Sequence, residues 1–175
     1  MRTKKMSKAI KWALYVLLAL LLFCFQNAPV RIGLFENVLF ILPFAVAFAC
    51  YEGLVPSLVL SVVLGLFWDY SAQREFGFCA LALCIICVSA NLVMKYFARP
   101  IFVSTFVCSC AAALLYILAD FFFFFVLRGY ENVGALFFVA VVERFFKTAV
   151  FSAIMAYVVK KIYDVSPNRA KFDFD

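Results

Sequence analysis

The chain has 175 residues, of which 68% are hydrophobic and 15% are charged. This composition leaves too little polar surface to cover a water-soluble globule of the same size, so it excludes a soluble single-domain protein. The formal net charge of +6 does not indicate nucleic-acid binding, because most basic residues stand beside apolar runs, as membrane orientation requires. Seven cysteines lie in apolar stretches and histidine is absent, so neither a disulfide framework nor a zinc or haem site is expected.

A basic amino terminus precedes the first predicted span. Residues 1–11 contain five basic side chains, and the apolar run 12–25 follows at once. A secretory signal peptide has the same layout, but no small-residue cleavage site follows; the next residues are Gln26, Asn27, Ala28 and Pro29. We therefore expect a retained first helix, with residues 1–11 in the cytoplasm.

The second and third predicted spans cover residues 34–51 and 54–70. Pro43 lies inside the second span, where we expect it to kink the helix. Glu52 and Gly53 form a tight turn, and a proline stands in the first turn of the third span, where its missing N–H costs little. The third span is short for a bilayer, so a re-entrant arrangement is an alternative.

Three further spans are predicted at residues 76–94, 101–127 and 133–159, followed by a basic tail at residues 160–175. A crossing helix needs roughly 20 apolar residues, so about six spans use almost the whole chain. The sequence thus predicts an all-α membrane protein of about six transmembrane helices, with residues 12–159 as a single helical domain.

Basic residues are distributed unequally between the two sets of helix ends. With the amino terminus inside, the cytoplasmic segments hold eleven of them, and the opposite segments hold three, Arg31, Arg74 and Arg128. Basic flanks remain on the cytoplasmic side of a membrane. We therefore expect both termini in the cytoplasm.

Four charged residues fall inside the last two predicted spans: Asp120, Glu143, Arg144 and Lys147. Each costs at least ~2.5 kcal/mol in hydrocarbon unless it faces a partner or water. Glu143 and Lys147 are spaced i and i+4 on one helix face, and a snorkelling Arg144 reaches Asp120 on the antiparallel neighbour. We expect internal ion pairs; a surface for a partner's transmembrane segment and an ion or solute pathway are the alternatives.

Asp69 and Arg74 stand beside the end of the third span, after Gly65 and Trp68. Glycine permits close approach of helices, and tryptophan suits the membrane interface. Two interpretations are open for Asp69 and Arg74: a solvated loop end without a particular partner, or a functional position. The sequence has no catalytic histidine, glycine-framed nucleophile or phosphate-binding glycine loop, so we do not expect an enzyme.

Two short motifs flank the linker after the third span. A glycine-leucine-x-x-aspartate signature ends one helix, and a glycine followed by an Ala-Leu pair begins the next. The residues that carry the pattern are Gly65, Leu66, Asp69, Gly77, Ala80 and Leu81 and, more weakly, Asp120. In this pattern, in length and in terminal charge the chain resembles the MreD family of bacterial rod-shape-determining membrane proteins. Glu143, Arg144 and Lys147 do not map onto the family pattern.

The resemblance implies a non-enzymatic scaffold subunit of the cell-elongation machinery in the bacterial cytoplasmic membrane, without a cofactor. The implied partners are an MreC-like protein, a RodA-like glycosyltransferase and a class B penicillin-binding transpeptidase, besides membrane lipid. The resemblance also implies a fold similar to the substrate-binding subunits of energy-coupling-factor vitamin transporters, and such a subunit is the alternative function. Because polar side chains near the outer face are few, the scaffold is favoured.

Overall fold

The computed structural model describes residues 8–27, 38–72, 77–97, 101–123 and 137–165, and every regular element in these ranges is helical. Four helices are α1 (Lys8–Asn27), α3 (Leu54–Ala72), α4 (Phe78–Tyr96) and α5 (Phe102–Phe121). Each has 19 or 20 residues and is long and apolar enough to cross a membrane. The prediction of an all-α protein with membrane-spanning helices is confirmed at this level, and four of the predicted spans are present.

Helix α2 (Ile41–Tyr51) is much shorter than the span predicted at residues 34–51. Its 11 residues extend roughly 16 Å, about half the thickness of the hydrocarbon core. Residues 38–40 are not helical, and residues 34–37 lie outside the described ranges. The prediction of a single crossing helix is therefore wrong for the described part of this segment. The expected kink at Pro43 is also wrong, because Pro43 stands in the first turn of α2, where no intrahelical bond is lost.

The last helix, α7 (Arg144–Val165), follows a π-helical segment, η3 (Phe138–Glu143). The two elements occupy most of the span predicted at residues 133–159, of which residues 133–136 lie outside the described ranges. Helix α7 continues past the predicted end through two lysines, since lysine is a good helix former. Its charged side chains keep it outside the group of four helices that are apolar enough to cross a membrane.

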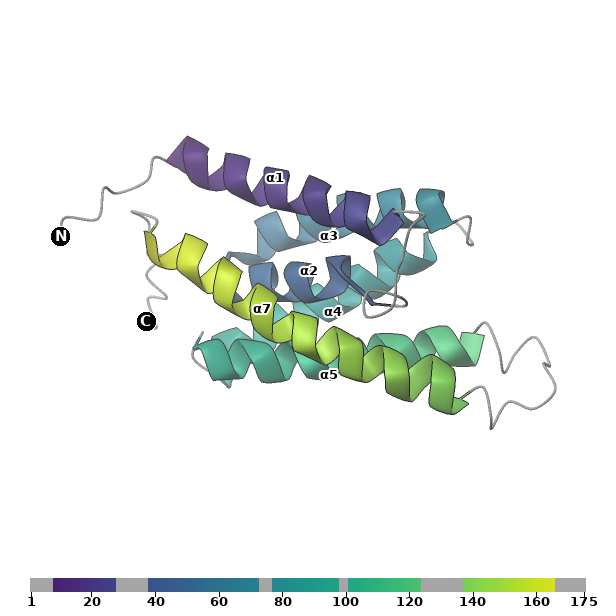
Figure 1. The fold of residues 1–175 in the computed structure, drawn as a ribbon. Helices are drawn as coiled ribbons and strands as arrows, with labels where there is room; N and C mark the ends of the chain where they lie inside the picture. Colours follow the sequence, from purple (N-terminus) through teal and green to yellow (C-terminus); the bar gives the residue numbers. More distant parts are fainter. Residues whose placement is uncertain (1–7, 28–37, 73–76, 98–100, 124–136, 166–175) are drawn as a thin grey trace.

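Helix α2 lies in the middle of the bundle, in contact with α1, α3, α4, α5 and α7 (Figure 1). Every residue of α2 is buried, and none of them is charged. A helix that is apolar on all sides belongs in an interior. The surrounding helices expose large apolar side chains on their outer faces, as expected where lipid replaces water as the solvent.

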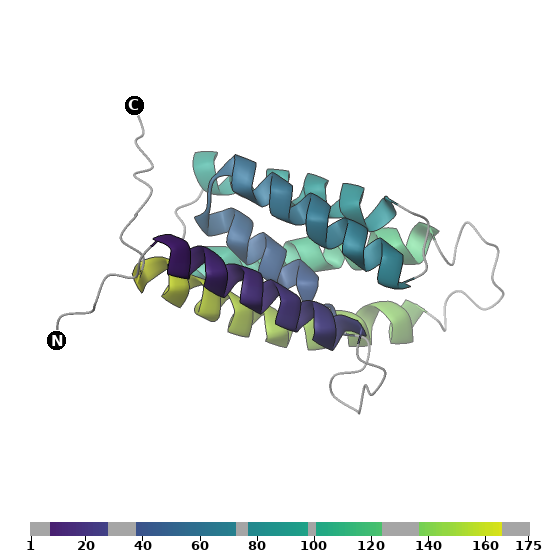
Figure 2. The same ribbon diagram turned by 90° about the horizontal axis from the view of Figure 1, so that it is seen from above.

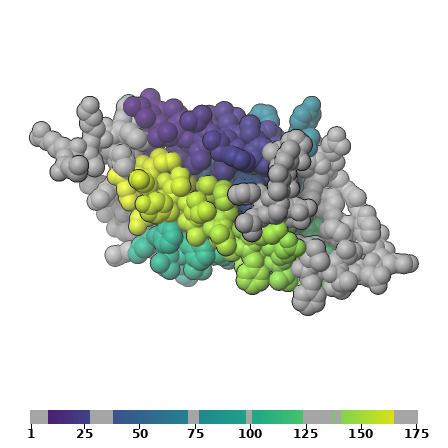
Figure 3. All heavy atoms as spheres, in the orientation of Figure 1, coloured from purple at the N-terminus to yellow at the C-terminus, as the bar shows by residue number. Residues whose placement is uncertain are grey.

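The bundle has two ends that differ in which helices begin or finish there. Helix α1 begins and α7 ends at one end, the terminal end, where the Lys11 ammonium lies 5.3 Å from the ring centre of Tyr163 (Figure 2). At the opposite end, the distal end, α1 and α3 finish and α4 begins. On the face shown in Figure 3, α7 lies between α1 and α5.

Candidate functional site

Asp69 lies at the distal end of α3, and its side chain is buried against the beginning of α4. Its Oδ2 accepts hydrogen bonds from the backbone N–H groups of Gly77 at 3.0 Å and Ala80 at 3.3 Å, and its Oδ1 accepts from Cys79 at 2.9 Å. The first N–H groups of a helix have no acceptor within the helix, and they attract an anion. A solvated loop end is therefore wrong for Asp69. Arg74 lies outside the described residues.

Glycine allows this contact between α3 and α4 at two positions. A Cβ added to Gly65 would lie 2.3 Å from the Cα of Ala80, so the two helix backbones touch there. Gly77, immediately before α4, has a φ of +99°, which residues with a side chain rarely adopt. Gly65, Asp69, Gly77 and Ala80 thus form one structural unit, the α3–α4 junction.

The remaining residues of the motif region divide between the surface and the core. Leu66 and Leu81 are exposed on the outside of the bundle. Trp68, for which the sequence suggested the membrane interface, points into the bundle: it is buried and stacks on the Tyr116 ring of α5 with 5.3 Å between ring centres. The Tyr116 hydroxyl lies 3.3 Å from the Sγ atom of Cys79. These contacts connect the α3–α4 junction to α5.

Asp120 of α5 and Arg144 at the start of α7 form the ion pair predicted from the sequence. The Nη1 atom of Arg144 donates to Oδ2 of Asp120 at 2.8 Å. The aspartate side chain is 4% exposed and the arginine side chain 20% exposed. The buried Nε atom of Arg144 has no hydrogen-bond partner among the described residues. The pair connects two antiparallel helices near their distal ends.

Glu143 and Lys147 form the other predicted pair, with 2.6 Å between Nζ and Oε1. This pair lies closer to the surface, since the glutamate side chain is 48% exposed and the lysine side chain 21% exposed. Both residues belong to the same helical stretch, so the pair does not connect two helices. It leaves a cation and an anion side by side on the surface where η3 meets α7.

A third ion pair connects α1 to the end of α2 and was not predicted. Lys11 and Glu52 are in contact, and both side chains are largely buried. Tyr15 donates to the same Glu52 oxygen at 3.2 Å, and the Asn91 amide donates to the carbonyls of Ala49 and Glu52 at 2.9 Å each. Charged residues at the ends of apolar runs are ordinarily solvated, so no local sequence signal indicates this pair.

The other end of α2 is also bonded to side chains of distant helices, which the sequence did not reveal. Oε1 of Gln26, near the end of α1, accepts the N–H of Phe40 at 2.7 Å. Oγ1 of Thr148, in α7, accepts the N–H of Leu39 at 3.3 Å. A backbone group without a partner is costly in an apolar environment. These two bonds allow a helix to begin inside the bundle.

The outside of the bundle carries open grooves lined by apolar side chains. One, of about 550 Å³, lies between α4 and α5 and includes Leu81, Ala82, Leu115 and Ala119. Another, of about 390 Å³, lies between α7 and residues 38–40. Within the described ranges, no three His, Cys, Asp or Glu side chains gather closely enough to hold a metal ion. The contacts of Asp69, Asp120 and Glu52 connect neighbouring helices, and the two grooves are lined mainly by apolar side chains.

Four of the motif residues that carry the resemblance to the MreD family have a common structural role, because they form the α3–α4 junction. Their pattern is therefore explained by helix packing in this chain. Glu143 of η3 and Arg144 and Lys147 of α7, which do not map onto the family pattern, take part in the two ion pairs described above. In comparisons with known proteins, no family model, curated protein or solved structure matches the chain.

Proposed function

We propose that this chain is a non-enzymatic scaffold subunit of the bacterial cell-elongation machinery, carried in the cytoplasmic membrane with both termini inside. The observation that carries the proposal is the contrast between an interior that pairs its own charges and an outside that offers apolar grooves. Asp69, Asp120 and Glu52 each face a donor on a neighbouring helix. Such a bundle presents other membrane proteins with packing surface and not with reactive groups. The motif residues within 65–81 indicate which machinery it serves.

The groove between α4 and α5 suits the transmembrane helix of a partner. It extends along α4 from Gly77 to Ser89, roughly 18 Å of helix. Ala82 and Ala119 line it, and small side chains allow helix backbones to approach closely. In the orientation predicted from the basic residues, Gly77 lies toward the outside of the cell. The groove then opens in the outer half of the membrane.

An MreC-like protein is the occupant we assign to the α4–α5 groove. The motif resemblance implies this protein as a partner, together with a RodA-like glycosyltransferase and a class B penicillin-binding transpeptidase. A helix of about 10–12 Å in diameter with its side chains can lie alongside the roughly 18 Å of α4 that line the groove. We assign this groove to the MreC-like transmembrane segment, and the two synthases would join through other surfaces of the complex.

A substrate-binding subunit of a vitamin transporter is the alternative function. Such a subunit needs hydrogen-bonding side chains that face the polar groups of its ligand. In the α4–α5 groove, the Ser89 hydroxyl donates to the carbonyl of Ile85 at 2.7 Å, within its own helix. The Tyr116 hydroxyl lies 3.3 Å from Sγ of Cys79. Because these groups are engaged within the protein, the groove favours an apolar occupant.

Affinity purification in a mild detergent tests the scaffold proposal. We expect the tagged chain to recover an MreC-like protein. Ala119→Phe fills the α4–α5 groove and should lower that recovery about tenfold, which corresponds to a loss of ~1.4 kcal/mol of binding free energy. Val107→Phe is the matched control, since Val107 is exposed elsewhere on α5 and does not line the groove.

Size-exclusion chromatography of both variants separates lost binding from lost folding. Equal recovery of the partner by the Ala119→Phe and Val107→Phe variants would remove the α4–α5 groove as the docking site. Recovery of a transporter ATPase and its coupling subunit, in place of an MreC-like protein, would overturn the scaffold function itself.

A further inference from the structure

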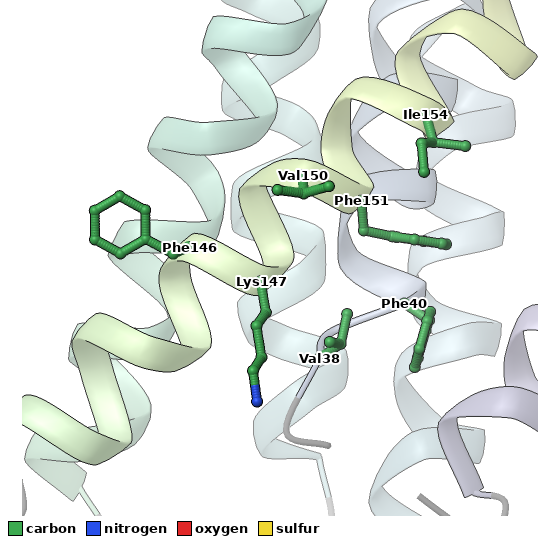
Figure 4. Close-up of a pocket in the computed structure, with 7 residues that line it drawn as sticks. All are labelled: Val38, Phe40, Phe146, Lys147, Val150, Phe151 and Ile154. Atoms are coloured by element: carbon green, nitrogen blue, oxygen red, sulfur yellow. The ribbon is translucent and has the colours of Figure 1, made fainter. Parts of the chain in front are cut away.

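The groove between α7 and residues 38–40 combines apolar walls with one charged end (Figure 4). Its volume is about 390 Å³. Val38 and Phe40 line it on one side, and Phe151 and Ile154 of α7 on the other. The rings of Phe40 and Phe151 meet edge to face at 4.8 Å between centres, which fixes the two sides relative to each other. This ring contact connects the two walls of the groove, which lies on the outside of the bundle.

Lys147 supplies the charged end of this groove. Figure 4 shows its ammonium directed away from Ile154, toward the end of the groove where Val38 lies. Side chains of a helix point toward its amino terminus, and the amino terminus of α7 is at the distal end. Glu143 lies one turn further in that direction and contacts the ammonium at 2.6 Å. The glutamate side chain is 48% exposed and the lysine side chain 21% exposed, so a ligand that reaches the carboxylate from outside also meets the edge of the ammonium beside it.

Contacts with α1 indicate how deep in the membrane the charged end of the groove lies. Phe40 donates its backbone N–H to Gln26, which is the residue before the last of α1. Phe151 packs on Phe40, and Lys147 lies one turn from Phe151 toward the distal end. A helix of 20 residues reaches the edge of the hydrocarbon core at its ends. Lys147 therefore lies near a membrane interface, and Ile154, roughly 10 Å along α7, lies in the hydrocarbon.

We propose that this groove binds one phospholipid with a primary-amine headgroup, such as phosphatidylethanolamine. The lipid phosphate binds the Lys147 ammonium, and the headgroup ammonium binds the Glu143 carboxylate through its N–H donors. One acyl chain lies along Val150 and Ile154. The protein presents a cation beside an anion, and this headgroup carries an anion beside a cation, so each charge of the lipid meets the opposite charge on the protein.

Charge and size distinguish this lipid from other occupants. An anionic headgroup without an amine would face the Glu143 carboxylate, and like charges repel. A choline headgroup has no N–H to donate to Glu143. The groove, at about 390 Å³, is smaller than the α4–α5 groove of about 550 Å³ that we assign to a partner helix, and a single acyl chain fits along the roughly 10 Å of α7 between Lys147 and Ile154.

Native mass spectrometry of the purified chain tests the proposal. The protein in detergent is titrated with phosphatidylethanolamine, phosphatidylcholine and phosphatidylglycerol, each with two oleoyl chains. We expect the first lipid to bind about tenfold more tightly than the other two, as one charge-assisted hydrogen bond of ~1.5 kcal/mol allows. Lys147→Gln should weaken its binding by a similar factor, and Glu143→Gln should remove the preference over phosphatidylglycerol.

Two further variants keep the test decisive. Lys161→Gln, which removes an exposed lysine at the other end of α7, should leave lipid binding unchanged. Val150→Trp fills the groove without altering its charges and should weaken the binding of all three lipids equally. Equal affinity for the three lipids in the unaltered protein would overturn the proposal. So would unchanged binding of phosphatidylethanolamine in the Lys147→Gln variant.

Discussion

Two aspartates hold two pairs of antiparallel helices together, and they do so with different partners. Asp69 of α3 accepts hydrogen bonds from three backbone N–H groups at the beginning of α4. Asp120 of α5 accepts a hydrogen bond from the guanidinium of Arg144 in α7. Both carboxylates are buried near the distal end of the bundle. Helices α3 and α4 are therefore held together by hydrogen bonds to backbone N–H groups, and α5 and α7 by a hydrogen bond from the Arg144 side chain.

The difference determines how far each pair of helices can adjust. Backbone N–H groups are fixed in α4, so Asp69 meets them only while the backbones of α3 and α4 remain in contact at Gly65. Arg144 carries its donors on a long side chain that is partly exposed. A small shift of α7 can be absorbed by that side chain. The α3–α4 junction is thus the rigid half of this comparison, and the α5–α7 contact is the adjustable half.

The largest effect is expected from Gly65→Ala, which breaks the rigid half. Its Cβ would lie 2.3 Å from the Cα of Ala80. Overpacking costs ~1–3 kcal/mol or more, and a backbone neighbour cannot rotate away, so we expect loss of most of the monodisperse protein in size-exclusion chromatography. Gly53→Ala is the control, because its Cβ would meet only the Pro56 ring at 3.8 Å. Equal yields of the two variants would contradict a backbone contact at Gly65.

Removal of the Asp69 carboxylate tests the same junction without adding volume. Asp69→Ala leaves buried N–H groups of α4 without this acceptor, at ~1–3 kcal/mol for each group, so we expect a loss of about 3 kcal/mol in the free energy of unfolding in mixed micelles. Asp69→Asn keeps one acceptor oxygen and should lose about half as much. Ser71→Ala is the control, since that hydroxyl bonds to the Trp68 carbonyl of its own helix. If the Asp69→Ala variant were as stable as the Ser71→Ala variant, the junction would not depend on the carboxylate.

The sequence predicted the ion pairs of the last two helices because their signal is local. A charge inside an apolar run is costly, so it indicates a partner, and the spacing of Glu143 and Lys147 names that partner directly. Asp120 and Arg144 followed from the antiparallel order of two neighbouring spans. The four long spans were predicted for the same reason, since length and hydropathy are properties of a single segment.

The sequence did not predict features that depend on distant helices. The apolar run through residues 38–51 contains no sequence signal for a helix start at Ile41, because the start of α2 is set by Gln26 of α1 and Thr148 of α7. Lys11 and Glu52 each stand at the end of an apolar run, where solvation is the ordinary expectation. Asp69 was left between two interpretations because its acceptor role requires the position of α4. Function was not predictable from these features, since they describe how the bundle is held together.

A double-mutant cycle tests the adjustable half of the comparison. Asp120→Asn or Arg144→Gln alone leaves a charge without its partner, and we expect a loss of ~2 kcal/mol each, below the value for fully buried pairs because the arginine is partly exposed. The double variant should recover part of the loss. Thermal unfolding in detergent measures all three. Strictly additive losses would show that the two residues do not stabilise the fold as a pair.

A smaller effect is expected at the beginning of α2, which lies between the two halves. Gln26→Leu and Thr148→Val remove the acceptors for the N–H groups of Phe40 and Leu39. Hydrogen bonds between membrane helices contribute about 0.6 kcal/mol on average, and a buried donor left unpaired adds to the cost, so we expect a loss of ~1 kcal/mol for each. Hydrogen exchange of the α2 amides should increase in both variants. Unchanged exchange would indicate that α2 begins at Ile41 without these acceptors.

The smallest effect on stability is expected for Glu143→Gln and Lys147→Gln. An ion pair within one helix contributes ~0.3–0.5 kcal/mol, and the glutamate side chain here is 48% exposed, so thermal unfolding in detergent should change little. The adjustable half of the molecule thus carries two ion pairs, one that connects α5 to α7 and one that lies at the surface within a single helical stretch. If either substitution destabilised the protein as much as Asp120→Asn does, the surface pair would be structural, and its effect on lipid binding could not be separated from folding. A small change in stability together with a large change in lipid preference would assign the pair to the ligand, because its two charges would then affect lipid binding and not folding.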